Sequence, residues 1–139
     1  MTLLERAIQI ALTAHAGQTS RDASPYILHP LRLMAEMDSD DERIVALLHD
    51  VIEDSSLTPE DLQKEGFASE VVEAVRLLTH EESVPNEEYV RRIKPNALAR
   101  KVKLADLRDN ADLRRMSGNQ EKDSARLKKY LGGWMILME

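Results

Sequence analysis

The chain has 139 residues, of which 42% are hydrophobic, 32% charged and only 4% aromatic, and its formal net charge is −6. This length fits one domain with a core of aliphatic side chains, and the acidic balance argues against nucleic acid as a partner, although a small basic pocket for a phosphorylated ligand is compatible with it. The chain has no cysteine, which excludes disulfides, and no apolar run of membrane-spanning length, so a cytoplasmic protein is expected.

The chain begins with a predicted helix and a polar loop. Residues 3–15 place their apolar side chains on one helical face, and Gly17 is expected to end this helix. His15 lies in its last turn, which favours a capping or packing role over contact with a ligand. The loop that follows, residues 18–25, ends in Ser-Pro and contains one basic residue, Arg21.

A second helix is expected within residues 25–37, where His29 directly precedes Pro30. Proline is preferred in the first turn of a helix, so His29 is placed at the beginning of this helix. A single histidine there is more often a cap or a buried residue than a metal ligand. His29 therefore becomes a candidate ligand only together with other residues.

The central stretch, residues 46–55, reads ALLHDVIEDS and holds four side chains that can bind a metal or move a proton. The apolar spacing predicts one continuous helix that begins near residue 40. In such a helix His49, Asp50, Glu53 and Asp54 share one edge, because side chains three or four apart stack. A neutral imidazole beside a carboxylate suits a divalent cation, and two carboxylates one turn further can orient or deprotonate a water.

The next segments are interpreted as scaffold. Residues 58–66, 68–79 and 86–93 are each expected to be helical, and Thr58 is expected to cap the first of them. The cluster of His80, Glu81 and Glu82 between the last two is expected to be a solvated loop rather than a metal site, because it is bounded by proline.

The second informative stretch is residues 96–116, which is expected to be a helix carrying Asp106 on its apolar face and Asn110 one turn further. A carboxylate in an apolar setting requires an explanation, and three basic residues precede Asp106: Arg100, Lys101 and Lys103. The arginines of this stretch are expected to form a solvated face with i,i+4 pairs: Arg100, Arg108, Arg114 and Arg115.

A last helix is expected at residues 121–131, followed by Gly132, Gly133 and the apolar tail WMILME. This tail packs either on the core or on a partner chain, which leaves a homo-oligomer open. No stretch alternates long enough to require a sheet, so the predicted fold class is all-α with a single domain over residues 1–139.

The candidate metal ligands combine two histidines with two aspartates: His29, His49, Asp50 and Asp106. Such mixed nitrogen and oxygen ligation suits Mn²⁺, Fe²⁺, Mg²⁺ or Zn²⁺, and a preference for six ligands favours manganese. The order of these residues resembles the HD superfamily of metal-dependent phosphohydrolases.

A closer resemblance is to the hydrolase domain of the bacterial RelA/SpoT alarmone enzymes and to the small hydrolases related to them. The segments that carry it are AHAGQ, PYILHPLRLM, ALLHDVIEDSSLTPEDL and VKLADLRDN. The long HDVIED version of the motif is far more specific than a His-Asp pair, and the four segments span most of the chain.

The resemblance implies an HD-type helical domain that removes pyrophosphate from the ribose 3′ position of (p)ppGpp and yields GDP or GTP. It implies that His29, His49, Asp50 and Asp106 hold one Mn²⁺, that Glu53 and Asp54 activate the hydrolytic water, and that Asn110 contacts the nucleoside. Arg21 and Lys103 are candidates to neutralise the phosphate charge.

The sequence departs from the family pattern near the expected nucleoside and phosphates. Ser20-Arg21-Asp22 stands where two adjacent basic residues are common, Asp109 where the larger enzymes usually carry His, and Leu113 where they often carry Thr. Two alternatives therefore stay open: an HD phosphohydrolase for another nucleotide, and a metal-dependent nucleotide-binding module that does not cleave its ligand.

Overall fold

The computed structural model describes residues 1–139, and it is helical apart from one isolated β-bridge between Thr19 and Pro25. The prediction of an all-α fold is confirmed. None of the helices combines the length and the apolar character that crossing a membrane requires. The elements in chain order are α1 (Leu3–His15), α2 (Leu28–Ala35), α3 (Asp40–Leu48), α4 (Val51–Asp54), α5 (Pro59–Lys64), α6 (Ser69–Leu78), α7 (Asn86–Ile93), α8 (Ala97–Asn110), a 3-10 turn (Leu113–Arg115) and α9 (Gln120–Met138).

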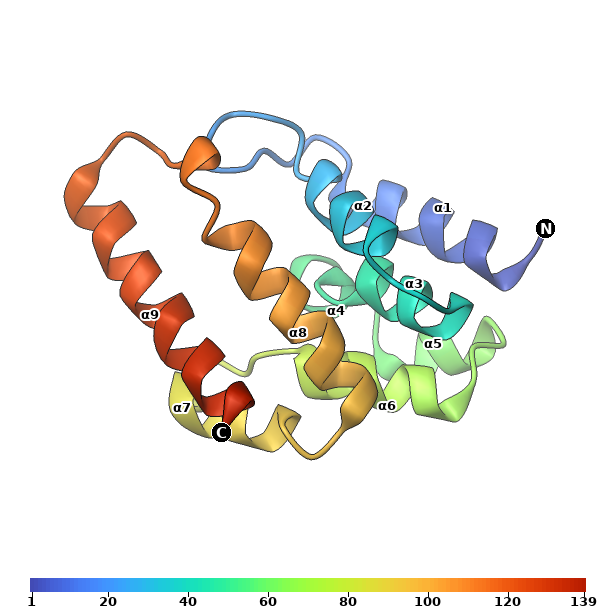
Figure 1. Ribbon diagram of the computed structural model, residues 1–139. Helices are drawn as coiled ribbons and strands as arrows, with labels where there is room; N and C mark the ends of the chain where they lie inside the picture. Colours follow the sequence, from blue (N-terminus) through green and yellow to red (C-terminus); the bar gives the residue numbers. More distant parts are fainter.

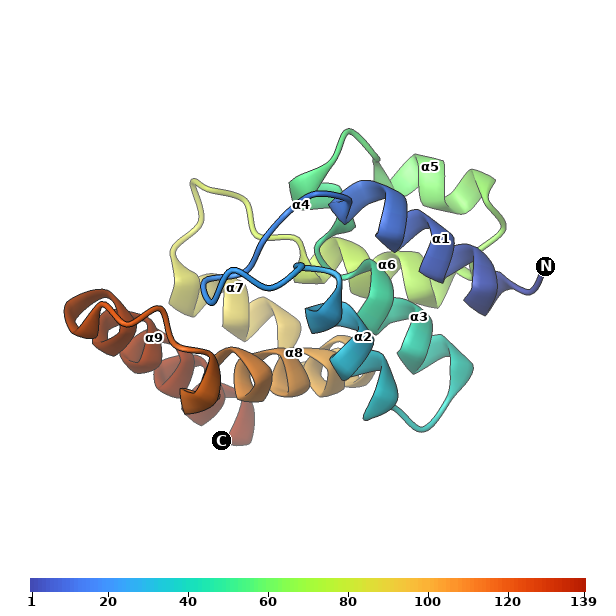
Figure 2. The same cartoon turned by 90° about the horizontal axis from the view of Figure 1, so that it is seen from above.

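Helix α8 lies in the middle of the molecule, with α9 along one side and α2 and α3 on the other (Figure 1, Figure 2). Its apolar side chains Ala99, Val102 and Ala105 are fully buried in a single core with residues such as Leu47 of α3 and Leu137 of α9. Because α8 touches α2, α3, α6, α7 and α9, any side chain on its inner face lies close to several segments that are distant in sequence.

The caps of the helices agree with the sequence pattern. Thr58 accepts a hydrogen bond from the backbone of Asp61, whose side chain accepts from the backbone of Thr58, and this reciprocal pair begins α5 where the sequence predicted it. Asn96 caps α8 with a single bond, in which its side-chain oxygen accepts from the backbone N–H of Ala99.

The central helix is not continuous, and this part of the sequence prediction is wrong. Helix α3 ends at Leu48, and Asp50 lies at φ −108° and ψ 3° before α4 begins at Val51. Adjacent side chains on a straight helix diverge by about 100°, whereas here His49 Nε2 lies 3.3 Å from Asp50 Oδ2. The break lets both side chains face the same point. Apolar spacing does not reveal the break, because the residues before it and after it both place apolar side chains toward the core.

The last helix also differs from the prediction, since α9 continues through Gly132 and Gly133 to Met138. Gly133 is buried against α8, where a Cβ would lie 3.5 Å from Leu107, an ordinary van der Waals distance, so this glycine packs within α9 instead of ending the helix. The tail packs on the core through Leu137, which is fully buried, while Met135 remains exposed.

The continuity of α9 predicts that Gly132→Ala stabilises the protein by about 0.5–1 kcal/mol, because alanine loses less backbone freedom than glycine in a helix interior. No atom within 4 Å opposes the new Cβ. Thermal unfolding followed by circular dichroism should show Tm rising by a few degrees. Gly66→Ala serves as the contrast, because Gly66 has φ +97° and its replacement should lower Tm. A lower Tm for Gly132→Ala would contradict a continuous α9.

Candidate metal centre

Four side chains from three separate parts of the fold meet beside α8: His29, His49, Asp50 and Asp106, here called the His/Asp cluster. His29 comes from α2, His49 and Asp50 from the break between α3 and α4, and Asp106 from α8. The ligand atoms of His29, His49 and Asp50 lie within 4.8 Å of one another. Asp106 Oδ1 lies 2.8 Å from His29 Nε2 and 3.4 Å from His49 Nε2. The structure therefore brings together all four ligands that the sequence suggested.

The outer nitrogen of each imidazole has an acceptor that assigns its proton. His49 Nδ1 lies 2.7 Å from the carbonyl oxygen of Ala46, and His29 Nδ1 lies 2.6 Å from Asp109 Oδ2. Both Nδ1 atoms therefore donate, and in the neutral rings the Nε2 lone pairs are directed at the cluster.

This arrangement fits a divalent cation. The Nε2 atom of His49 is buried without a hydrogen-bond partner. With neutral rings, the Nε2 lone pairs of His29 and His49 face the oxygen of Asp106 with no proton between them, which is repulsive unless a positive charge lies among them. Two imidazole nitrogens and two carboxylates form a donor set that suits several divalent metals. The cluster could thus hold a metal ion.

The charge balance of the cluster also shifts its pKa values. Burial lowers the pKa of His49, but Asp50 and Asp106 outweigh burial and raise this pKa well above its ordinary value. For His29, burial again lowers the pKa, but hydrogen bonds to Asp106 and Asp109 outweigh it and raise this pKa. Burial raises the pKa of Asp50, yet His49 prevails and the pKa of Asp50 falls to about 2.

These shifts predict how the stability of the metal-free protein depends on pH. A histidine with a raised folded-state pKa stabilises the protein fully below the unfolded value near 6.5, and this contribution is lost as the pH rises through the folded-state pKa. Scanning fluorimetry with a chelator should therefore show Tm falling as the pH rises above about 6.5. Excess divalent metal should reduce this fall, because the cation then replaces the protons. A Tm of the chelated protein that rises in this range would contradict the charge balance described here.

Glu53 and Asp54, the predicted water-activating pair, lie in α4 and do not face the same way. Glu53 and Asp50 line one hollow of about 210 Å³, here called the Glu53 pocket. Glu53 accepts a hydrogen bond from the backbone N–H of His80, and partial burial raises its pKa. Asp54 is directed toward α1, where its Oδ2 lies 3.7 Å from His15 Nδ1. Of the two carboxylates, Glu53 is the one placed beside the pocket.

Lys103 and Asn110, two predicted substrate contacts, both touch Asp106. Lys103 Nζ lies 2.9 Å from Asp106 Oδ2 and sits over the ring of Tyr89, and Asn110 Nδ2 donates to Asp106 Oδ1 at 3.1 Å. The buried ammonium of Lys103 beside this carboxylate has a pKa raised above its ordinary value, because Asp106 outweighs burial. Both residues also line the Glu53 pocket, where Lys129 of α9 joins them.

Arg21, the third predicted substrate contact, extends from the loop after α1 to residues of α8 and α9. It donates to Tyr130 Oη and to the carbonyl oxygen of Asn110, each at 2.9 Å. It lines a second hollow of about 220 Å³, the Arg21 pocket, together with Arg32, Arg115 and Asn110. His29 lines the Arg21 pocket, and Asp50 and Asp106 line the Glu53 pocket, so the two hollows flank the His/Asp cluster.

Several residues at the site were missed by sequence reasoning. Tyr26 donates its hydroxyl to Asp50 Oδ2, and burial together with Asp50 raises its pKa. His80, expected in a solvated loop, instead stacks on Tyr89 with 4.1 Å between ring centres and lines the Glu53 pocket. Tyr130 lay in a helix with no polar pattern that would single it out.

Arg115 is a further correction, because it does not lie on a solvated face. Its guanidinium Nη2 lies 2.6 Å from Asp109 Oδ1, and its side chain is 20% exposed. The predicted i,i+4 pairs do not form either. Arg108 and Arg114 are exposed but pair with Glu36 and Asp112, and half-buried Arg100 donates to the carbonyl oxygen of Leu137 at 2.9 Å.

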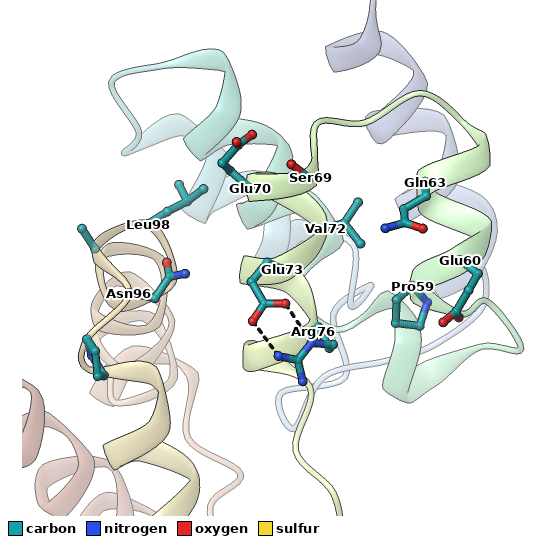
Figure 3. A pocket seen from close by; sticks show the side chains of 12 residues that line it. Pro59, Glu60, Gln63, Ser69, Glu70, Val72, Glu73, Arg76, Asn96 and Leu98 are labelled. Atoms are coloured by element: carbon teal, nitrogen blue, oxygen red, sulfur yellow. Dashed lines mark hydrogen bonds and ion pairs between the residues drawn. The ribbon is translucent and has the colours of Figure 1, made fainter.

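The largest hollow of the molecule lies away from this cluster. A groove of about 810 Å³ runs between α5, α6 and the beginning of α8, as Figure 3 shows. Its one guanidinium, Arg76, is already paired with Glu73 at 2.5 Å, and its remaining charged side chains are exposed glutamates. The groove gathers no histidine and no set of converging ligands, so size alone does not identify the functional site.

Comparisons with known proteins identify several to which this chain is similar. No family model matches the chain. A guanosine-3′,5′-bis(diphosphate) 3′-pyrophosphohydrolase of Vibrio cholerae is 47% identical over 76 residues, which is 52% of this chain and 11% of the relative. The bifunctional (p)ppGpp synthase/hydrolase SpoT of Escherichia coli is 43% identical over 76 residues. The aligned segment thus spans only about a tenth of these longer relatives.

A solved structure extends the similarity to nearly the whole chain. It is described as a metazoan orthologue of SpoT that hydrolyses ppGpp and plays a role in starvation responses. The fold matches with a TM-score of 0.71 and 26% identity, over 97% of this chain and 91% of the other. The chain is therefore similar to SpoT-type (p)ppGpp hydrolases in sequence over about half of its length, and to a SpoT orthologue in fold over nearly all of it.

Proposed function

We propose that the chain hydrolyses the 3′-pyrophosphate of (p)ppGpp to GDP or GTP and pyrophosphate, with Mn²⁺ held by His29, His49, Asp50 and Asp106. The observation that supports this most strongly is the meeting of four candidate ligands, two of them imidazoles whose Nε2 atoms face the cluster, beside a pocket that contains Glu53. A divalent cation in this cluster supplies Lewis acidity, which polarises phosphoryl oxygens and acidifies water beside it.

Glu53 and Asp54 are proposed to act on the attacking water. Glu53, with its raised pKa, is suited to take the proton of the attacking water. The bond between phosphorus and the ribose 3′ oxygen breaks, a bond from phosphorus to the water oxygen forms, and the 3′ oxygen takes up a proton. Asp54, beside His15, is proposed to support this step from outside the pocket.

The proposed substrate contacts lie in the two pockets described above. Lys103 and Lys129 supply positive charge in the Glu53 pocket, where the pyrophosphate is proposed to lie. Asn110 and Arg21 border the opposite pocket, where the nucleoside is proposed to lie. This orientation places the bond to be cleaved next to the His/Asp cluster.

The test is release of pyrophosphate from ppGpp by protein that has been stripped of metal and reloaded with Mn²⁺. Release that requires Mn²⁺, with GDP as the second product, is the expected result. The same assay with Mg²⁺, Fe²⁺ or Zn²⁺ decides the choice of metal. Binding of ppGpp without any release would favour a nucleotide-binding module instead.

A second candidate is hydrolysis of another nucleotide, and one contact favours it. Asp109 pairs with both Arg32 and Arg115 of the Arg21 pocket, which reduces the positive charge available there for a phosphate. A panel of nucleoside monophosphates, diphosphates and triphosphates with free or phosphorylated 3′ positions would separate the candidates. Turnover of these compounds without turnover of ppGpp would replace the first proposal.

A further inference from the structure

Asp109 lies in the last turn of α8, outside the His/Asp cluster but in contact with it. Its side chain is 8% exposed, and its Oδ2 lies 2.6 Å from His29 Nδ1. The opposite ring nitrogen, His29 Nε2, lies 2.8 Å from Asp106 Oδ1 inside the cluster. The imidazole of His29 therefore spans the distance between Asp109 and the cluster.

Two arginines fix the carboxylate of Asp109 in this orientation. Arg32 approaches with Nε 2.8 Å from Oδ1 and Nη2 2.9 Å from Oδ2, and Arg115 Nη2 lies 2.6 Å from Oδ1. Such a two-pronged contact restricts rotation of the carboxylate. The neighbouring His29 and Arg32 also hold the pKa of Asp109 well below its usual range, although burial acts in the opposite direction.

A carboxylate in this place has a definite chemical effect on a ligating histidine. By accepting the proton of Nδ1, it selects the tautomer whose Nε2 lone pair is free, fixes the plane of the ring and increases the basicity of Nε2. For His49 the same role falls to the carbonyl oxygen of Ala46, at 2.7 Å from Nδ1. A carbonyl carries no charge, so His29 is the histidine with the stronger outer acceptor.

We propose that Asp109, held by Arg32 and Arg115, is a positioning residue that orients His29 and strengthens its Nε2 as a metal ligand. This inference rests on the proposed metal centre and assigns Asp109 to metal binding instead of nucleoside binding. The contact joins residues that are 80 positions apart in the chain.

The first experiment compares Mn²⁺ affinity in the wild type and in Asp109→Asn by titration calorimetry without nucleotide. Loss of the charged acceptor is expected to weaken Mn²⁺ binding by about 10–100-fold. The Mn²⁺ concentration for half-maximal turnover should rise by the same factor, while KM for the nucleotide at saturating Mn²⁺ changes much less. A raised KM with unchanged Mn²⁺ affinity would overturn the proposal.

Asp112→Asn is the matched control. Asp112 also pairs with Arg115, at 3.3 Å, and with Arg114, but it makes no contact with His29. This control should retain the wild-type Mn²⁺ affinity. If it loses as much affinity as Asp109→Asn, the effect arises from the arginines and the proposed role of Asp109 is wrong.

A second measurement needs no variant and therefore does not depend on how well Asp109→Asn folds. In the Zn²⁺-loaded wild type, ¹⁵N NMR of the histidine side chains should show His29 protonated at Nδ1 and bound to metal through Nε2. Protonation at Nε2 would overturn the proposal. If the wild type binds neither Mn²⁺ nor Zn²⁺, the metal centre itself is refuted, whereas normal wild-type binding with no loss in Asp109→Asn refutes only the role of Asp109.

Discussion

Glu53→Gln is expected to lower the rate of pyrophosphate release by about 10²–10⁴-fold, the usual contribution of a positioned general base. Glutamine has nearly the same shape and can still accept the hydrogen bond from the backbone of His80, but it cannot take a proton at neutral pH. Because Glu53 is not one of the four proposed ligands, Mn²⁺ affinity should remain within error of the wild type. Single-turnover kinetics at saturating Mn²⁺ would measure the chemical step directly.

The control for Glu53→Gln is Glu82→Gln, a substitution of the same chemical kind at an exposed position near His80. It should leave the rate and Tm unchanged. Full activity in Glu53→Gln would show that Glu53 does not accept the proton. A loss of rate together with a loss of Mn²⁺ binding would show that Glu53 acts through the metal.

Asp106→Asn is expected to abolish Mn²⁺ binding and to destabilise the metal-free protein by about 3–5 kcal/mol, the usual cost of removing one partner of a buried ion pair. The carboxylate faces the ammonium of Lys103 at 2.9 Å, and the two side chains are only 7% and 15% exposed. Neutralising Asp106 leaves the charge of Lys103 in the interior with no equivalent partner. Urea denaturation with a chelator present measures the loss of stability without any contribution from metal.

The double variant Lys103→Met with Asp106→Asn separates the two effects of the Asp106 substitution. If the destabilisation comes from the unpaired ammonium, methionine at position 103 should recover a large part of it, while Mn²⁺ binding stays absent. Normal Mn²⁺ affinity in Asp106→Asn would remove Asp106 from the proposed ligand set. No recovery in the double variant would place the cause of instability elsewhere.

The elements that sequence reasoning predicted correctly are those governed by local chemistry. The first helix and the helix at residues 86–93 coincide with α1 and α7 because apolar spacing and nearby capping or proline residues determine their ends. The four candidate ligands meet because each of their segments buries its apolar face in the same core.

The features that the sequence did not predict depend on contacts between distant residues. The break at Asp50 leaves the apolar pattern of residues 44–52 unchanged, so no local signal marks it. His80 lies at the site because its ring stacks on Tyr89 and its backbone N–H donates a hydrogen bond to the carboxylate of Glu53. Gly132 and Gly133 predicted a stop, but the packing of Gly133 against α8 outweighs the low helix propensity of glycine.

The position of α9 separates the lining of the Glu53 pocket from the residues proposed to bind the metal. Lys129, Tyr130 and Gly133 of α9 line the Glu53 pocket, whereas the four proposed ligands all lie within residues 29–106. Because the pyrophosphate is proposed to lie in the Glu53 pocket, substitutions in α9 are expected to alter which phosphate group this pocket accepts, without altering the residues proposed to carry out hydrolysis.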